Sequence, residues 1–436
     1  MNLYPLKKIV YFLLISWQLA AQDVLTLDEA IGLAKTNNAS IKISQQVAEI
    51  AGLQVYKGNA GLKPRVDLNT NVGSALNNVR QKLSNGTEIV RPNGQSLSPN
   101  ANVALQWTLY DGHRGTAMYE RLRMQSDLRQ LETKQTTEQI TTAVSRAYFE
   151  IIRQKRTEKI LETIIGYYEE KRRIAEERWT IGRGSKLDFL QASVDLNTQK
   201  MGILQTKNAL KNAKTALNGI LERDLTTEYD VTDFPEVTIS SMTLEEIKQK
   251  AKESNRDLIL NKQNILVSKI LEKETEALKM PRVFLNSGYG FSLNSSNAGF
   301  ILLNQNIGLN ATIGATWNIY NGEQIRRNTQ ISKLNTKVLE SREDDIWSQV
   351  SSNLRRNFNQ YQTDKQILSL EIQNLALAEE NLKIALEKFK LGASTILELN
   401  QAQQSYDQAA NRIINSEFNI KIGELEILRL SGELGK

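Results

Sequence analysis

The chain is an internal duplication, and no other feature of the sequence restricts the possible folds as strongly. Residues 26–38 read TLDEAIGLAKTNN, and residues 243–255 read TLEEIKQKAKESN. The two segments align at an offset of 217 residues, and the same offset joins Pro64 to Pro281 and Asn38 to Asn255. A repeat that keeps register in this way predicts two structurally equivalent halves.

The second part of each copy aligns at an offset of 210 residues. WTLYDG at 107–112 matches WNIYNG at 317–322, and RWTIGRGSKLDFLQA at 178–192 matches KFKLGASTILELNQA at 388–402. The change in offset falls in the polar stretch between Leu76 and Asn100, which is longer than its counterpart in the second copy.

Very long helices are predicted in both copies. The chain has no proline between residues 100 and 234 or between 282 and 436, and proline is the residue that most often ends a helix. Apolar residues recur there at intervals of three and four, as at Ile140, Val144, Ala147 and Ile151. A helix from about Arg114 to Ile181 would be about 100 Å long. We expect long antiparallel hairpins with coiled-coil packing and tips near residues 182 and 392.

Two stretches in each copy change to strand periodicity. They lie at about 66–75 and 101–110, and at about 282–292 and 307–320. One face of each is apolar, and the other carries Asn, Gln, Thr and Gly. This alternation is expected of a membrane β-barrel with lipid outside and water inside, although a soluble sheet with one face on a core alternates in the same way. Four strands cannot close a barrel in lipid, whereas three copies would supply twelve, so the pattern favours an oligomer.

Aromatic residues mark equivalent ends of these strands in the two copies, where an interfacial girdle of a membrane barrel is expected. They are Trp107, Tyr110, Trp317 and Tyr320.

The N-terminal residues 1–22 are typical of a secretory signal. Lys7 and Lys8 precede an apolar core from Ile9 to Leu19, and small residues follow at Ala20 and Ala21. We expect export from the cytoplasm. Because no later run of 18 apolar residues exists, a membrane-embedded part would have to be a β-barrel.

Composition excludes several functional classes. The chain has no cysteine and a single histidine, His113, which excludes disulfides, thiolate zinc sites and multi-histidine metal sites. A net charge of +6 over 436 residues is too dilute for a nucleic-acid surface. No convergent nucleophile, base or metal set appears, so we expect no enzyme and no cofactor. An envelope-associated structural or adhesive coiled-coil protein without a pore remains the alternative to a channel.

Taken together, the repeated TLDEAIGLAKTNN segment, the proline before each strand pair, the W-x-x-Y-x-G elements and the paired glycines resemble the TolC-type outer-membrane efflux family over nearly all of the mature length. The resemblance implies a mainly α fold with a small β part. Three chains would form a 12-stranded barrel in outer-membrane lipid and a long α-helical barrel across the periplasm. Such a homotrimer docks on a periplasmic adaptor (membrane fusion) protein and an inner-membrane pump, and conducts drugs, small molecules or secreted substrates outward without chemistry.

The resemblance also implies roles for individual residues. The residues at the hairpin tips would meet the adaptor: Ile181, Gly182, Arg183, Leu391, Gly392 and Ala393. Acidic and amide residues just beyond the tips would ring the tunnel entrance, although an isolated helical carboxylate is often only solvated: Glu398, Asp188, Gln401 and Gln191.

The chain therefore divides into four expected segments. These are a signal peptide at 1–22, a first repeat at 23–221, an equatorial connector at 222–241 and a second repeat at 242–436.

Overall fold

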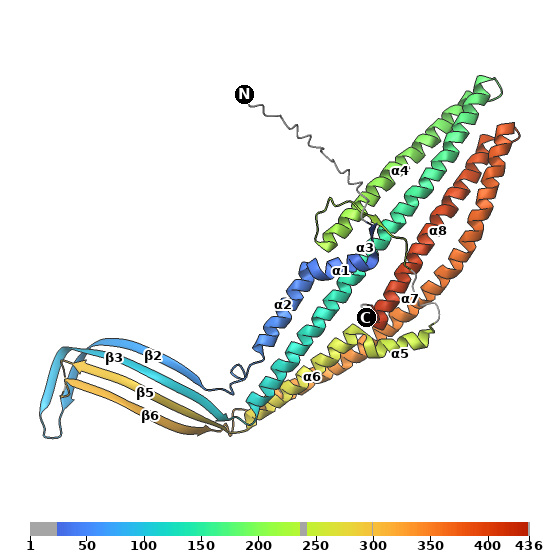
Figure 1. Cartoon of the computed structure of the whole chain (residues 1–436). Helices are drawn as coiled ribbons and strands as arrows, with labels where there is room; N and C mark the ends of the chain where they lie inside the picture. Colours follow the sequence, from blue (N-terminus) through green and yellow to red (C-terminus); the bar gives the residue numbers. More distant parts are fainter. Residues whose placement is uncertain (1–23, 236–241, 299, 435–436) are drawn as a thin grey trace, which may run out of the picture.

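The protein is elongated, with a β-sheet at one end and two helical hairpin tips at the other (Figure 1). The computed structural model describes residues 24–235, 242–298 and 300–434. The predicted signal peptide at 1–22 and part of the predicted connector lie outside the described residues.

Long helices connect the two ends of the molecule. The helices are α1 (Leu27–Asn37), α2 (Ala39–Gln54), α3 (Arg114–Thr180), α4 (Lys186–Leu221), α5 (Leu244–Ser254), α6 (Arg256–Glu276), α7 (Gln324–Leu391) and α8 (Ile396–Ser431). The 67 residues of α3 and the 68 of α7 extend about 100 Å each. Within the described part of the chain, no helix has a stretch apolar enough to span a membrane.

The predicted duplication is confirmed by the contacts of two buried asparagines. The Asn38 side-chain amide donates to Ile220 O at 3.0 Å, and that of Asn255 donates to Leu430 O at 2.9 Å. Each side-chain oxygen also accepts from a backbone amide at the start of the following helix. The donors differ by 217 residues and the acceptors by 210, as the two sequence offsets require.

The four long strands form one antiparallel sheet in the order β2-β3-β5-β6. They are β2 (Arg65–Lys82), β3 (Glu88–Tyr110), β5 (Arg282–Ser296) and β6 (Leu303–Thr316). β2 and β3 run well beyond the predicted 66–75 and 101–110. The apolar alternation stops in the polar stretch, but backbone pairing continues to Lys82 and Glu88, where a tight turn closes the hairpin. Alternation of apolar and polar residues shows which side chains of a strand are meant for an apolar environment. It does not reveal a strand segment that is held only by backbone hydrogen bonds.

β6 ends at Thr316, four residues before the predicted end at 320. Its last pairing is with Arg282, the first residue of β5. Pro281 precedes Arg282 and has no N–H to continue the ladder. Trp317 and Tyr320 therefore lie just after the strand and not within it, unlike Trp107 and Tyr110 in β3.

The two faces of the sheet differ in polarity across all four strands. Residues paired across the ladder form an exposed apolar row of Leu68, Val103, Tyr289 and Leu309. Residues of the opposite parity form a polar row of Asn71, Asn100, Ser292 and Asn306. The predicted alternation is therefore in register from one edge of the sheet to the other.

Three separate apolar clusters are distributed along the helices. The first surrounds Val144 and Tyr148 where α1, α3 and α4 meet, and the second lies toward the tips around Ile164 and Phe389. The third, around Leu354, joins α5, α7 and α8. The described part of the chain is therefore held together along its length by several clusters and not by one central core.

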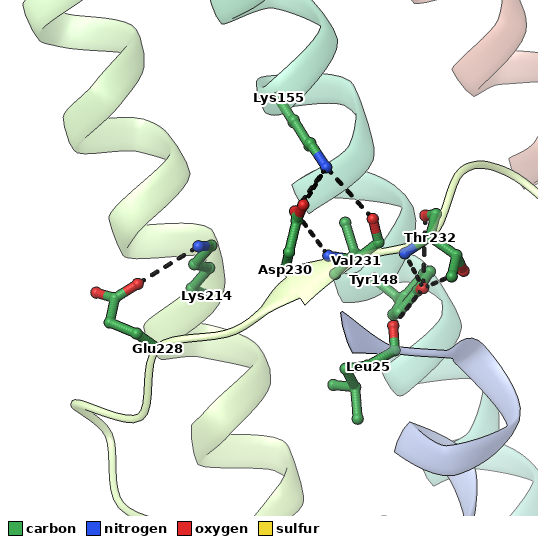
Figure 2. A network of polar contacts seen from close by, with 8 residues as sticks. All are labelled: Leu25, Tyr148, Lys155, Lys214, Glu228, Asp230, Val231 and Thr232. Carbon is green, nitrogen blue, oxygen red and sulfur yellow. Dashed lines mark hydrogen bonds and ion pairs between the residues drawn. The ribbon is translucent and has the colours of Figure 1, made fainter. Parts of the chain in front are cut away.

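A short parallel pair, β1 (Val24–Leu25) and β4 (Asp230–Val231), joins the start of the described chain to the connector after α4. The Tyr148 hydroxyl of α3 donates to Leu25 O at 2.7 Å and accepts from Thr232 N at 3.0 Å (Figure 2). Lys155 Nζ lies 2.6 Å from an oxygen of Asp230. The connector is thereby fixed against the middle of α3.

Candidate pore entrance and docking tips

The two tips close their helices with the same backbone geometry. Gly182 has φ of +75° and Gly392 of +79°, in the left-handed region that a side chain rarely adopts. Arg183 N donates to Arg178 O and Ala393 N donates to Lys388 O, both at 2.8 Å. These bonds pair carbonyls that the end of a helix would leave free.

The tips present apolar side chains to solvent. Ile181 and Leu391 beside the glycines are exposed, and Leu187 and Leu397 in the next helical turns are also exposed. All four predicted neighbours of the tip glycines lie at the extreme end of the molecule, where a partner could reach them. They are Ile181, Arg183, Leu391 and Ala393.

A contact that sequence reasoning missed joins the two tips. Arg178 Nη1 donates to Phe389 O at 2.9 Å, and its guanidinium lies 4.9 Å from the centroid of the Phe389 ring. Beside it, Trp179 stacks on Phe189 with ring centroids 5.5 Å apart. The duplication pairs Trp179 with Phe389, but it carries no signal for contacts between the two copies.

Asp188 and Glu398 occupy equivalent third positions of α4 and α8, just beyond the tips. Thr395 Oγ1 accepts from Glu398 N at 3.3 Å, and the Ser185 hydroxyl caps α4 by accepting from Leu187 N at 3.1 Å. An acidic side chain in the first turn interacts favourably with the amide end of a helix. Capping alone therefore accounts for a carboxylate here, and the exposed side chain of Glu398 is also free to contribute negative charge.

The two predicted glutamines lie one turn further along. Gln191 donates to Asp195 Oδ1 at 2.8 Å within α4. The side chain of Gln401 is exposed on α8. The four entrance residues thus lie in two equivalent helical turns, and among the described residues no side-chain hydrogen bond joins any two of them.

The four predicted interface aromatics differ between copies. Trp107 and Tyr110 are each 39% exposed, whereas Trp317 is 61% and Tyr320 is 80% exposed. The Trp317 indole donates to Lys279 O at 3.0 Å. The aromatic side chains of the second copy are therefore more exposed than their counterparts in the first copy.

Comparison with known proteins agrees with this architecture. The family model described as "Outer membrane efflux protein" matches residues 30–222 and 248–433. The chain belongs to this family. No curated protein sequence matches closely enough to count as a relative.

Solved structures of similar fold include three outer-membrane proteins. The outer-membrane channel OprN aligns with a TM-score of 0.78 at 15% identity, covering 93% of this chain and 90% of that one. The outer membrane protein VceC of Vibrio cholerae aligns at 0.75 and 15% identity, covering 93% and 96%. The CmeC channel of Campylobacter jejuni aligns at 0.76 and 16% identity, covering 93% and 85%.

The family assignment confirms the resemblance found in the sequence and favours the channel over the pore-free coiled-coil alternative. As an outer membrane efflux protein, the chain is an outer-membrane efflux channel whose helical part lies in the periplasm. Members of the family are passive channels.

Proposed function

We propose that three copies of this chain close one continuous tunnel, which carries drugs, small molecules or secreted substrates outward without chemistry. One observation supports this most directly. The sheet is apolar on one face and polar on the other in every strand, yet β2 and β6 each have one edge that no strand of the described residues pairs with. An open edge cannot remain in lipid, and four strands from each of three copies make a twelve-stranded barrel whose apolar rows face outward.

The duplication predicts how the strands of neighbouring chains pair in the trimer. Within one chain Val103 of the first copy faces Tyr289 of the second. The equivalent of Val103 in the second copy is Ile313, at an offset of 210, and the equivalent of Tyr289 in the first copy is Val72, at an offset of 217. Ile313 of one chain should therefore face Val72 of the next. The same transfer sets Trp317 opposite Leu68 of the next chain.

The environments of two equivalent glycines support this transfer. A Cβ added at Gly112 would clash with Met280 Cβ and lie 2.9 Å from Ala277 O, whereas no atom of the described residues lies within 4 Å of a Cβ added at Gly322. Offsetting Ala277 by 217 residues gives Ala60. We therefore expect Ala60 of the next chain to cover Gly322, and with it the exposed Trp317 and Tyr320.

Cysteine crosslinking tests the register directly, because the natural chain has no cysteine. Ile313→Cys combined with Val72→Cys is expected to form disulfide-linked trimers, since directly opposed strand residues have Cβ atoms about 5 Å apart. Ile313→Cys combined with Leu68→Cys is the matched control, four residues out of register. Equal crosslinking of both pairs, or crosslinking only in the control, would contradict the arrangement.

We further propose that the tips dock a periplasmic adaptor that connects the channel to an inner-membrane pump. The exposed Ile181 and Leu391 support this, because apolar side chains at the end of an elongated molecule mark a protein contact. Photocrosslinking groups at Arg183 and Ala393 are expected to capture one adaptor in the cell. Capture at exposed mid-helix positions instead would contradict docking at the tips.

We also propose that the carboxylates at the tunnel entrance make the channel prefer cations. Three copies of Glu398, with Asp188 close to the same end, would set a negative potential around a narrow axis, while Gln191 and Gln401 add neutral polar groups. In planar bilayers the parent is expected to conduct and to prefer cations. Glu398→Gln should reduce that preference and the block by divalent cations, and an unchanged selectivity would remove Glu398 from the entrance.

A purified protein that needs no detergent and gives no conductance would overturn the tunnel itself.

A further inference from the structure

A polar cluster of buried and half-buried side chains lies on the seam between the two hairpins, where α8 packs along α3. Its groups come from three helices, two residues from α3, one from α4 and three from α8. They are Tyr168, Lys171, Asp195, Asn400, Gln403 and Asp407.

Lys171 is the centre of this cluster. Its side chain is 0% exposed, and its ammonium lies 2.7 Å from Asp195 Oδ2 and 2.7 Å from Asn400 Oδ1. The same nitrogen lies 4.6 Å from the centroid of the Tyr168 ring. Because Asp195 belongs to the first hairpin and Asn400 to the second, one ammonium joins both hairpins of the chain.

The cluster holds one carboxylate more than it has cations. Lys171 is paired with Asp195. Among the described residues the Asp407 carboxylate has one hydrogen-bond partner, the Tyr168 hydroxyl, which donates to Asp407 Oδ2 at 3.2 Å. Burial raises the pKa of Asp407 to about 6, while Tyr168 and Lys171 act in the opposite direction.

The remaining neighbours do not neutralise this charge. The charged groups of α7 at this level, Glu379 and Lys383, act on the adjacent Tyr406. Gln403 is 0% exposed, and neither atom of its amide has a hydrogen-bond partner among the described residues. An ionised Asp407 therefore remains poorly compensated in a desolvated seam.

We propose that this cluster fastens the two hairpins of one chain to each other and makes the fastening tighter in acid than at neutral pH. The inference rests on the proposed function, because the fastened hairpins would form the periplasmic end of the tunnel. At neutral pH the ionised Asp407 carboxylate destabilises the closed seam. When it gains a proton, the buried charge disappears, the Lys171–Asp195 pair remains, and α8 packs more tightly on α3.

A trimer has two kinds of seam between hairpins, one within each chain and one between neighbouring chains. The polar cluster lies only on the seam within a chain. At the offset of 210 residues, the equivalents in the other copy are Asn381 for Lys171, Ser405 for Asp195 and Asn197 for Asp407. These neutral residues would meet where the second hairpin of one chain packs on the first hairpin of the next. The seam between chains thus lacks the charged link, and the two hairpins of one chain should move as a unit.

The test measures the separation of the hairpins within one chain. Spin labels are attached at Thr163→Cys in α3 and Gln404→Cys in α8, and labelled chains are diluted into unlabelled ones. Pulsed electron paramagnetic resonance is expected to give a distance distribution that narrows from pH 7.5 to pH 5 with a midpoint near pH 6. Asp407→Asn should be narrow at both pH values. Lys171→Met removes the ammonium that joins Asp195 and Asn400 and should therefore be broad at both pH values.

Glu380→Gln is the matched control, because it removes an exposed carboxylate from α7 and should leave the parent response unchanged. Circular dichroism confirms that each variant retains its helices. A parent with no pH response, or Asp407→Asn with the parent response, would overturn the fastening. Conductance is recorded on the same samples, so loss of conductance with an intact pH response counts against the tunnel alone.

Discussion

At the scale of single residues, the two buried asparagines make a matched pair. Asn255 donates to Leu430 O and accepts from Asp257 N and Leu258 N, so its replacement leaves buried backbone groups unpaired. Asn255→Ala and Asn38→Ala are each expected to lower the free energy of unfolding by about 1–3 kcal/mol. Urea unfolding followed by helical circular dichroism in detergent measures this.

The exposed Asn197 supplies the control for that pair. Asn197→Ala should change the unfolding free energy by less than about 0.5 kcal/mol. If Asn38→Ala and Asn255→Ala differed greatly from each other, the two copies would not be energetically equivalent.

The sign of the pH dependence at Asp407 follows from its raised pKa. A carboxyl with a pKa of about 6 in the folded protein, against 3.8 ordinarily, binds its proton more tightly when folded. Its stabilising effect is complete below pH 3.8 and is lost as pH rises through 6. Asp407→Asn should therefore raise the unfolding free energy at pH 7.5 by about 1–2 kcal/mol, with partial exposure discounted, and change it little at pH 4. A variant less stable than the parent at pH 7.5 would contradict this sign.

A structural role could be predicted from the sequence for residues that recur in both copies. It could not be predicted for residues that occur in only one copy. Gly182 and Gly392 stand out because both copies require a left-handed residue where the helix ends. Lys171 matches Asn381 in the other copy, and its partners are brought together only when the hairpins pack. Without that packing, nothing distinguishes Lys171 from a solvated helical lysine.

At the scale of elements, Gly182 controls how the first hairpin turns. Nothing lies within 4 Å of a Cβ added there, so a substitution is opposed by backbone strain alone. Gly182→Ala should weaken the tip by about 1–2 kcal/mol, whereas Gly182→Asn should cost less, because asparagine tolerates this conformation. Amide hydrogen exchange over residues 178–186 measures the difference. Equal protection in the two variants would exclude strain as the reason for glycine.

Tyr148 is expected to control whether β1 stays on β4. Tyr148→Phe removes the bonds to Leu25 O and Thr232 N, and should cost about 1–2 kcal/mol with faster amide exchange at Leu25. Tyr229→Phe, which loses one bond to Lys214 O, is the matched control and should leave exchange at Leu25 nearly unchanged. Slow exchange in Tyr148→Phe would mean that backbone pairing with β4 and apolar packing hold β1 without the hydroxyl.

Helix positions could be predicted closely, and strand ends could not. The absence of proline and the three-and-four spacing bound α3 to within a residue of the predicted Arg114–Ile181. The ends of β3 and β6 are instead set by a distant hairpin turn and by Pro281, which precedes a different strand. These are properties of the pairing partner, so the alternation within one strand does not report them.

At the scale of the whole molecule, the duplication predicts how the two kinds of seam should differ. The labels at Thr163 and Gln404 have counterparts at Gln373 of one chain and Val194 of the next. Only the seam within a chain contains Lys171 and its carboxylates. We therefore expect the pair between chains to give a broader distance distribution, with no change between pH 5 and pH 7.5. A pH response of equal size at both seams would mean that the trimer responds as one body, and the buried charges of a single seam would then not be its cause.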